Sequence, residues 1–193
     1  MDNHKGKRLF ITGIPTAGKS YLAKLLAEQT NAITVLFDKV LDGYMTDPKY
    51  EKWINFYWNQ DERAYLTQTS PDEQRRNLIL QAECFWPLFA KCIRSYQDEM
   101  RPVIFDSVSL LPSIVRREFD FPGIILAGSS VEETLIRNQK NPRWSKVSEL
   151  QELEARTFFD IERPLYLEEA QRFNLPVFEK ADDAISYCVD LLK

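Results

Sequence analysis

A short run near the start of the chain combines residue types that bind phosphate. Gly13 and Gly18 bracket the run, and Lys19 and Ser20 follow directly, which satisfies the pattern G-x-x-x-x-G-K-[ST]. The glycines let the backbone turn tightly and aim successive N–H groups inward, and a helix starting near Lys19 adds the positive end of its dipole. The run is therefore predicted to cradle a polyanion such as a nucleotide triphosphate.

Each residue of this run has its own predicted role. Lys19 should reach the outer phosphates as a mobile charge, and the Ser20 hydroxyl should coordinate Mg²⁺. The alternative is a glycine-rich turn in which the Lys-Ser pair is incidental. The predicted nucleotide-binding residues are Gly13, Ile14, Pro15, Thr16, Ala17, Gly18, Lys19, Ser20 and Tyr21.

Two acidic residues each follow an apolar run. Asp38 comes directly after residues 33–37, and Asp106 directly after residues 102–105. Both should emerge at the carboxyl ends of strands, the edge where open α/β sheets bind ligands. Asp38 is predicted to orient or deprotonate an attacking hydroxyl, with helix capping as the alternative. For Asp106 we predict a role in holding the metal or the acceptor.

These residues must be positioned by alternating strands and helices. Short β-branched runs alternate with segments of helical period, which predicts a three-layer α/β/α fold around a five-stranded parallel sheet. The stretch between residues 40 and 101 is too long for one loop, and its clearest helix spans 72–97, capped by Ser70 and bent at Pro87. The expected strands are 8–12, 33–37, 102–105, 123–127 and 176–178, and helices are also expected at 20–28 and 184–192.

Aromatic residues crowd the segment upstream of that long helix. Packing in the core is the more common role for aromatic side chains at near-helical spacing, and lining of a binding cleft is the alternative. The residues are Tyr44, Tyr50, Trp53, Phe56, Tyr57, Trp58 and Tyr65.

The composition excludes several classes of function. The chain has 193 residues, a net charge of −4 and 44% hydrophobic residues, which suits one domain. Its only histidine, His4, lies in the polar start, so histidine-based triads and zinc sites are not expected. The three cysteines have no metal-binding spacing and predict reduced thiols. Without a long apolar run or a basic block, we expect a cytoplasmic protein that binds neither membranes nor nucleic acid.

With these motifs the chain resembles the P-loop NTPases, and within them the small-molecule and nucleotide kinases such as shikimate kinase, chloramphenicol phosphotransferase and nucleoside monophosphate kinases. The resemblance implies transfer of the γ-phosphoryl group of ATP, with Mg²⁺, to a hydroxyl or phosphate of a small-molecule acceptor. It also implies an acceptor-binding helical insertion at about residues 43–100 and a mobile lid at about 137–160. The alternatives are a nucleoside monophosphate kinase and a nucleotide-gated regulatory NTPase that binds a protein partner; the oligomeric state stays open.

The same resemblance suggests three arginine roles. In the predicted lid, Arg137 and Arg143 would neutralise the migrating phosphoryl group, with a solvated helix face as the alternative. Residues 162–166 are similar to the Arg-x-Pro-Leu-Tyr segment of shikimate kinases, whose arginine grips the acceptor, so the resemblance makes Arg163 an acceptor or phosphate contact. The alternative for Arg163 is an ion pair with Asp160. Shikimate kinases have three glycines after strand three, where this chain has residues 105–109, so shikimate itself is not expected as the acceptor.

Overall fold

The computed structural model describes residues 5–193, and His4 lies outside the described residues. Within that part of the chain, no helix combines the length and apolarity needed to cross a membrane.

The described chain is built around a five-stranded sheet in which every pair of neighbouring strands is parallel. The strands are β1 (Arg8–Gly13), β2 (Ile33–Leu36), β3 (Val103–Asp106), β4 (Gly123–Leu126) and β5 (Val177–Phe178), in the order β2-β3-β1-β4-β5. Central β1 places Phe10 beside Phe105 of β3 and beside Gly123 of β4. The predicted fold class is confirmed, and each strand lies within about a residue of its expected position.

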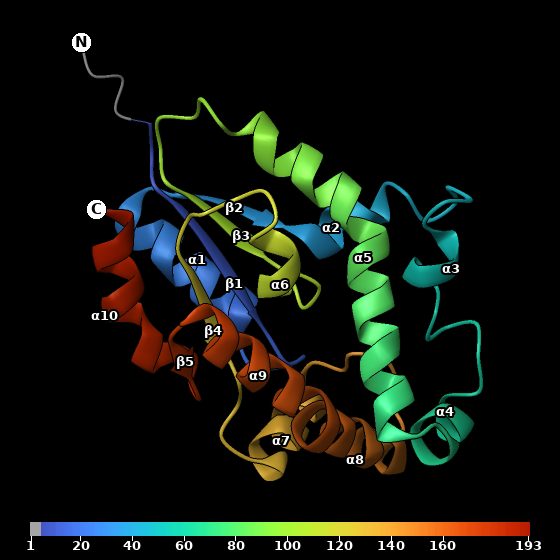
Figure 1. Cartoon of the computed structure of the whole chain (residues 1–193). Helices are drawn as coiled ribbons and strands as arrows, with labels where there is room; N and C mark the ends of the chain where they lie inside the picture. Colours follow the sequence, from blue (N-terminus) through green and yellow to red (C-terminus); the bar gives the residue numbers. More distant parts are fainter. Residues whose placement is uncertain (1–4) are drawn as a thin grey trace.

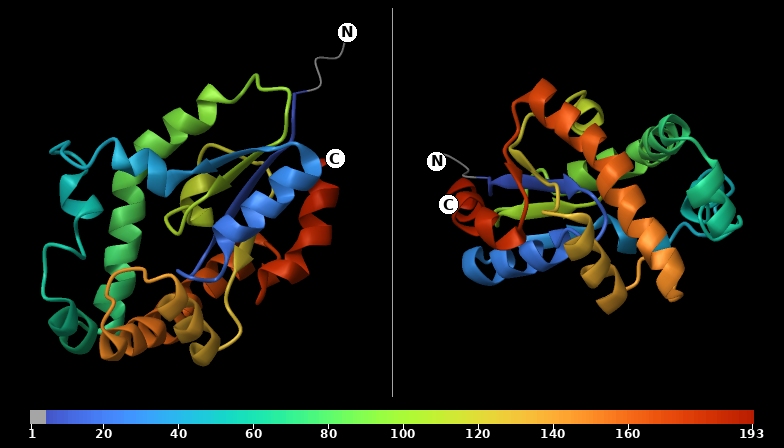
Figure 2. Two further views of the ribbon diagram at one scale, coloured as in Figure 1. Left: turned by 180° about the vertical axis from the view of Figure 1, so that it is seen from behind. Right: turned by 90° about the horizontal axis from the view of Figure 1, so that it is seen from below.

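Helices cover both faces of this sheet. In chain order they are α1 (Lys19–Thr30), α2 (Phe37–Asp42), α3 (Glu51–Ile54), α4 (Glu62–Gln68), α5 (Pro71–Ser95), α6 (Pro112–Val115), α7 (Val131–Lys140), α8 (Ser148–Arg156), η1 (Thr157–Glu162), α9 (Arg163–Phe173) and α10 (Ala181–Leu192). Helices α1 and α10 pack together on one face, and α6 and α9 lie on the other (Figures 1 and 2). Helices α2 to α5 fill the long connection between β2 and β3, as expected.

The sequence around α5 explains where this helix begins and bends. The Ser70 hydroxyl accepts a hydrogen bond from the Glu73 N–H at 3.2 Å, and Pro71 occupies the first helical position. Pro87 lies inside the helix, where it cannot donate to the carbonyl four residues earlier. The helix changes direction along its length (Figure 1), as Pro87 predicts.

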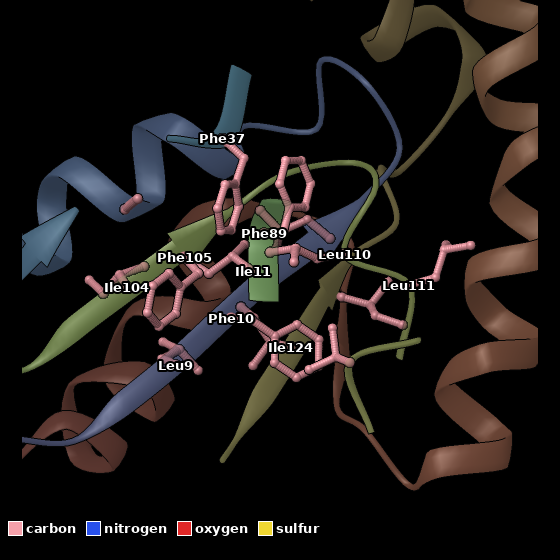
Figure 3. Close-up of a cluster of buried hydrophobic side chains, with 14 of the residues drawn as sticks. Leu9, Phe10, Ile11, Phe37, Phe89, Ile104, Phe105, Leu110, Leu111 and Ile124 are labelled. Carbon is pink, nitrogen blue, oxygen red and sulfur yellow. The ribbon is translucent and has the colours of Figure 1, made fainter. Parts of the chain in front are cut away.

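An aromatic stack anchors the end of β2. The ring of Phe37 is fully buried and stacks on Phe89 of α5, with ring centroids 3.9 Å apart (Figure 3). Phe105 of β3 lies next to it, with a centroid separation of 6.1 Å. Phe37 is the first residue of α2, whereas the sequence predicted it as the last residue of the strand. Because its ring is buried, the neighbouring Asp38 is fixed at the carboxyl edge of the sheet.

We predict that Phe89→Ala lowers the free energy of unfolding by about 3–5 kcal/mol, because it leaves a cavity beside Phe37. The matched control is Leu80→Ala on the same helix, where the side chain is 41% exposed, and its effect should stay below about 1 kcal/mol. Urea unfolding measures both values. Equal losses in the two variants would contradict the role assigned to this stack.

Candidate active site

The turn after β1 depends on glycine at two positions. Gly13 has φ of 130°, and a Cβ there would lie 1.9 Å from the Leu126 carbonyl oxygen of β4. Gly18 has φ of 94°, and a Cβ there would lie 3.0 Å from the Arg137 guanidinium. A side chain at either position would be strained by the positive φ, and at Gly13 it would also collide with the β4 backbone. The loop conformation therefore requires both glycines of the sequence motif.

The Lys19 side chain is folded into this loop. Its Nζ donates hydrogen bonds to the carbonyl oxygens of Gly13 at 3.2 Å and of Ile14 at 2.8 Å. Burial lowers the pKa of Lys19 to about 8, although the nearby Asp106 charge acts in the opposite direction. A polyphosphate next to this ammonium would favour its charged form, so the loop suits an anion.

Ser20 and Asp106 meet beneath the loop, as predicted from their positions. The Ser20 hydroxyl donates a 2.6 Å hydrogen bond to Oδ2 of Asp106, whose pKa is raised by burial. A hydroxyl and a carboxylate are oxygen ligands of the kind that Mg²⁺ takes alongside water and phosphate. Residues 5–193 hold no cluster of three or more His, Cys, Asp or Glu able to bind a metal, so a cation here would take its other ligands from phosphate and water.

Thr16 gives independent support for an anion in the loop. Its backbone is left-handed, with φ of 60°, which is unusual for a β-branched residue. Its hydroxyl oxygen is buried and has no hydrogen-bond partner among the described residues. A buried hydroxyl without a partner is unfavourable unless a ligand completes it, and a phosphate oxygen would do so. The residues present therefore fit a bound triphosphate.

Asp38 lies on the other side of the loop and pairs with a distant arginine. Its Oδ2 accepts a 2.9 Å hydrogen bond from Nη1 of Arg143, which lies between α7 and α8. Asp38 does not cap α2, because the N-cap position is occupied by Leu36 and Asp38 lies in the first turn. The capping alternative is therefore wrong, and the two predicted site residues are brought together.

Arg137 contacts the loop itself. Its Nη1 donates to the Ala17 carbonyl at 3.1 Å, and its Nη2 pairs with Glu133 at 2.5 Å. The two predicted lid arginines thus lie at different places, Arg137 against the phosphate loop and Arg143 beside Asp38. Tyr21, also predicted to bind nucleotide, is 54% exposed on α1.

A cavity of about 220 Å³ opens beside Asp38. Pro15 of the loop forms part of its wall. Polar lining comes from Asp38, Asp42, Asn55, Gln81, Ser109, Arg143 and Glu162, and aromatic lining from Tyr57, Trp58, Phe85 and Trp144. The aromatic segment thus divides between the two roles considered for it: Tyr50 and Tyr65 are buried, whereas Tyr57 and Trp58 line the cavity.

Arg163 lies outside this cavity. Its Nε donates to the Ala127 carbonyl at 3.1 Å, and its guanidinium lies 3.8 Å from Glu179, beyond the ends of β4 and β5. The Arg163 guanidinium thus pairs with Glu179 and not with Asp160, and the acceptor contact expected of it stays a prediction. Glu162, the last residue of the π-helical segment η1, lines the cavity instead.

Sequence reasoning missed Glu162, although a signal for it was present. In the Arg-x-Pro-Leu-Tyr pattern the arginine stands two residues before the proline, and in this chain that position is Glu162. Trp144, which lies next to Arg143 and stacks on Tyr57, was also missed. No periodicity in the sequence around Trp144 points to the cavity, because the residue lies in an irregular connection.

Comparison with models of known protein families and with curated protein sequences finds no match. Solved structures do match over nearly the whole chain. Deoxyadenosine kinase from M. mycoides with bound dATP is 14% identical, with a TM-score of 0.55 and coverage of 95% of this chain and 97% of that chain. Shikimate kinase from Bacteroides thetaiotaomicron is 14% identical, with a TM-score of 0.54 and coverage of 96% and 98%. Shikimate kinase from Acinetobacter baumannii in complex with shikimate is 15% identical, with a TM-score of 0.51 and coverage of 97% and 93%.

Helices α4 and α8 are in contact (Figure 1), and each carries an acid, Glu62 on α4 and Glu154 on α8. Glu154 is fully buried and accepts hydrogen bonds from the Asn138 amide at 2.5 Å and from the Ser145 N–H at 2.9 Å. Oε1 of Glu62 is buried without a partner among the described residues. Burial and a hydrogen bond to Glu154 raise the pKa of Glu62 to about 8. When Glu62 is protonated, its carboxyl group can therefore donate a hydrogen bond to Glu154.

We predict that the protein becomes less stable as pH rises from about 5 to above 8. An acid whose pKa is raised by folding contributes its stability fully below its unfolded pKa, and loses it as pH passes the folded value. Glu62→Gln should flatten the dependence of melting temperature on pH, with the remaining slope due to Asp106 and Glu162, whose pKa values burial also raises, that of Glu162 to about 7. Glu51→Gln, at an exposed helical position, is the control. A wild-type slope in Glu62→Gln would refute the role of this pair.

Proposed function

Since the chain has the fold of the P-loop small-molecule kinases, we propose that it is an ATP-dependent phosphotransferase that moves the γ-phosphoryl group to a small-molecule acceptor. One observation carries this proposal. The loop between β1 and α1 holds Lys19 and Ser20 on one side, and on the other it borders a cavity that contains the Asp38–Arg143 pair. A nucleotide site and an acceptor site therefore share one boundary, as group transfer requires.

The nucleotide would be held by the first turn of α1. The N–H groups of the first turn of a helix have no partner within the helix and, with its dipole, attract phosphate. Lys19 supplies a buried ammonium, and Ser20 with Asp106 would hold Mg²⁺, which neutralises charge on the phosphates when bound. A purine nucleoside triphosphate, dATP, is bound in the structure of deoxyadenosine kinase, which supports nucleotide binding by this fold.

The acceptor would lie in the cavity with its reactive oxygen at Asp38. In the proposed reaction this oxygen bonds to the γ-phosphorus while the bond from phosphorus to the β–γ bridging oxygen breaks, and ADP leaves with that electron pair. If the acceptor atom is a hydroxyl, its proton passes to Asp38. Arg143 orients Asp38 and supplies positive charge to the transferring group.

Two segments would complete the site. We assign acceptor binding to the helical insertion at about residues 43–100, because it supplies Tyr57, Trp58 and Phe85 to the cavity. We assign the role of a lid to residues 137–160, because they bring Arg137 to the loop and Arg143 to Asp38.

We predict that Lys19→Ala abolishes the stabilisation by ATP and lowers phosphotransfer about a hundredfold or more, because it removes the charge nearest the phosphates. The rise in melting temperature with MgATP measures binding, and ADP release in the presence of pooled acceptors measures transfer. Lys91→Ala, at an exposed position of α5, should behave as wild type. No effect of MgATP on wild-type melting would contradict the proposal.

We predict that Asp38→Asn lowers kcat by about 10²- to 10⁴-fold for a hydroxyl acceptor while changing the KM for ATP little. The amide retains the size of the side chain but cannot take the proton. Asp72→Asn is the control, because Asp72 also lies in the first turn of its helix, remote from the cavity. Steady-state kinetics measure kcat and the KM for ATP in each variant. An unchanged kcat would show that Asp38 is not the base.

A further inference from the structure

Glu162 is a buried acid for which the described part of the chain provides no hydrogen-bond donor. The residue is 5% exposed and faces the cavity. Within residues 5–193, no group donates a hydrogen bond to the Glu162 carboxylate. Asp38, another acid that lines the cavity, is by contrast paired with Arg143. Glu162 therefore has both of its oxygens available to a molecule in the cavity.

Such an arrangement is unfavourable in a protein without ligand. The Glu162 oxygens reach the cavity and are not sealed in the core, but burial of most of the side chain without a protein donor still disfavours the charged form. Burial accordingly raises the pKa of Glu162 to about 7, even though Arg143 and Lys19 act to lower it. A hydrogen-bond donor on a bound molecule would remove this penalty.

The walls of the cavity indicate the shape of that molecule. Tyr57 of the insertion stacks on Trp144, with ring centroids 4.0 Å apart and planes at 23°. Phe85 and the exposed ring of Trp58 extend this aromatic lining. Aromatic faces favour flat or cyclic apolar groups, and they also attract cations.

The charges of the lining residues indicate the sign of the molecule. Asp38, Asp42 and Glu162 contribute carboxyl groups, and Arg143 is the only lysine or arginine among the described lining residues. Because three carboxyl groups face one guanidinium, a carboxylate or phosphate on the acceptor would meet net repulsion.

We propose that Glu162 binds an N–H or O–H donor of the acceptor, and that the acceptor is an uncharged or cationic ring compound phosphorylated on a hydroxyl, not an anion. This inference rests on the proposed function and narrows it. Nucleotides and hydroxy acids are thereby excluded as acceptors, whereas nucleosides, amino sugars and cyclic amino alcohols remain.

The test compares pools of hydroxylated ring compounds that differ in charge. The cationic pool contains amino sugars and cyclic amino alcohols, the neutral pool contains nucleosides, and the anionic pool contains the matching nucleoside monophosphates and cyclic hydroxy acids. ADP release with MgATP should rise with a member of the cationic or neutral pool. Stimulation by the anionic pool alone would overturn the proposal.

Two variants attribute the effect to Glu162. For the stimulating compound, Glu162→Gln should raise the acceptor KM about tenfold or more, with the KM for ATP changed less than about twofold. Glu169→Gln is the matched control, because Glu169 is a buried acid on α9 outside the cavity that accepts a hydrogen bond from the Ser113 N–H. An unchanged acceptor KM in Glu162→Gln, or an equal change in both variants, would refute the role of Glu162.

Melting temperatures measured with each pool in the absence of ATP separate this inference from the proposed function. Stabilisation by a cationic or neutral compound that is lost in Glu162→Gln supports the inference even if ADP release never rises, in which case only the proposed transfer fails. If MgATP stabilises the wild type but neither the cationic nor the neutral pool has any effect, the inference itself is wrong.

Discussion

The close approach of the β1 and β4 backbones at Gly13 determines the geometry of the site. The Ile14 N–H donates to the Leu126 carbonyl at 3.2 Å, and the same carbonyl oxygen lies where a Cβ of residue 13 would be. The chain can therefore leave β1 only in a glycine conformation, and this sets the loop that folds around Lys19. The direction in which the chain leaves β1 determines where α1 starts. It thereby also determines the Ser20–Asp106 hydrogen bond and the boundary of the cavity.

The second half of the site depends on residues far apart in the sequence. Asp38 is fixed because Phe37 is buried against α5, and Arg143 reaches it from the connection between α7 and α8. Exposed ion pairs of this kind add little stability. The pair is better understood as positioning two functional groups than as holding the fold together.

The parts of the site that lie at strand ends could be predicted from the sequence. Asp38 and Asp106 follow apolar runs, and parallel strands bring their carboxyl ends to one edge, so their placement next to the loop required no knowledge of side-chain packing. Glu162 and Arg163 could not be assigned in this way. They are neighbours at the junction of η1 and α9, and only Glu162 lines the cavity, which the sequence pattern does not specify. The division of the aromatic residues likewise depends on how short helices α3 and α4 pack, which hydrophobic spacing does not specify.

The stack of Tyr57 on Trp144 joins the helical insertion to the connection that carries Arg143. Any outward swing of that connection must separate the two rings, and it must also withdraw the guanidinium from Asp38. In the proposed reaction, opening the site to bulk solvent would therefore also remove the guanidinium from the catalytic carboxylate. If the proposed reaction holds, the adjacency of Arg143 and Trp144 in the chain would therefore disfavour hydrolysis of the nucleotide while the site is open.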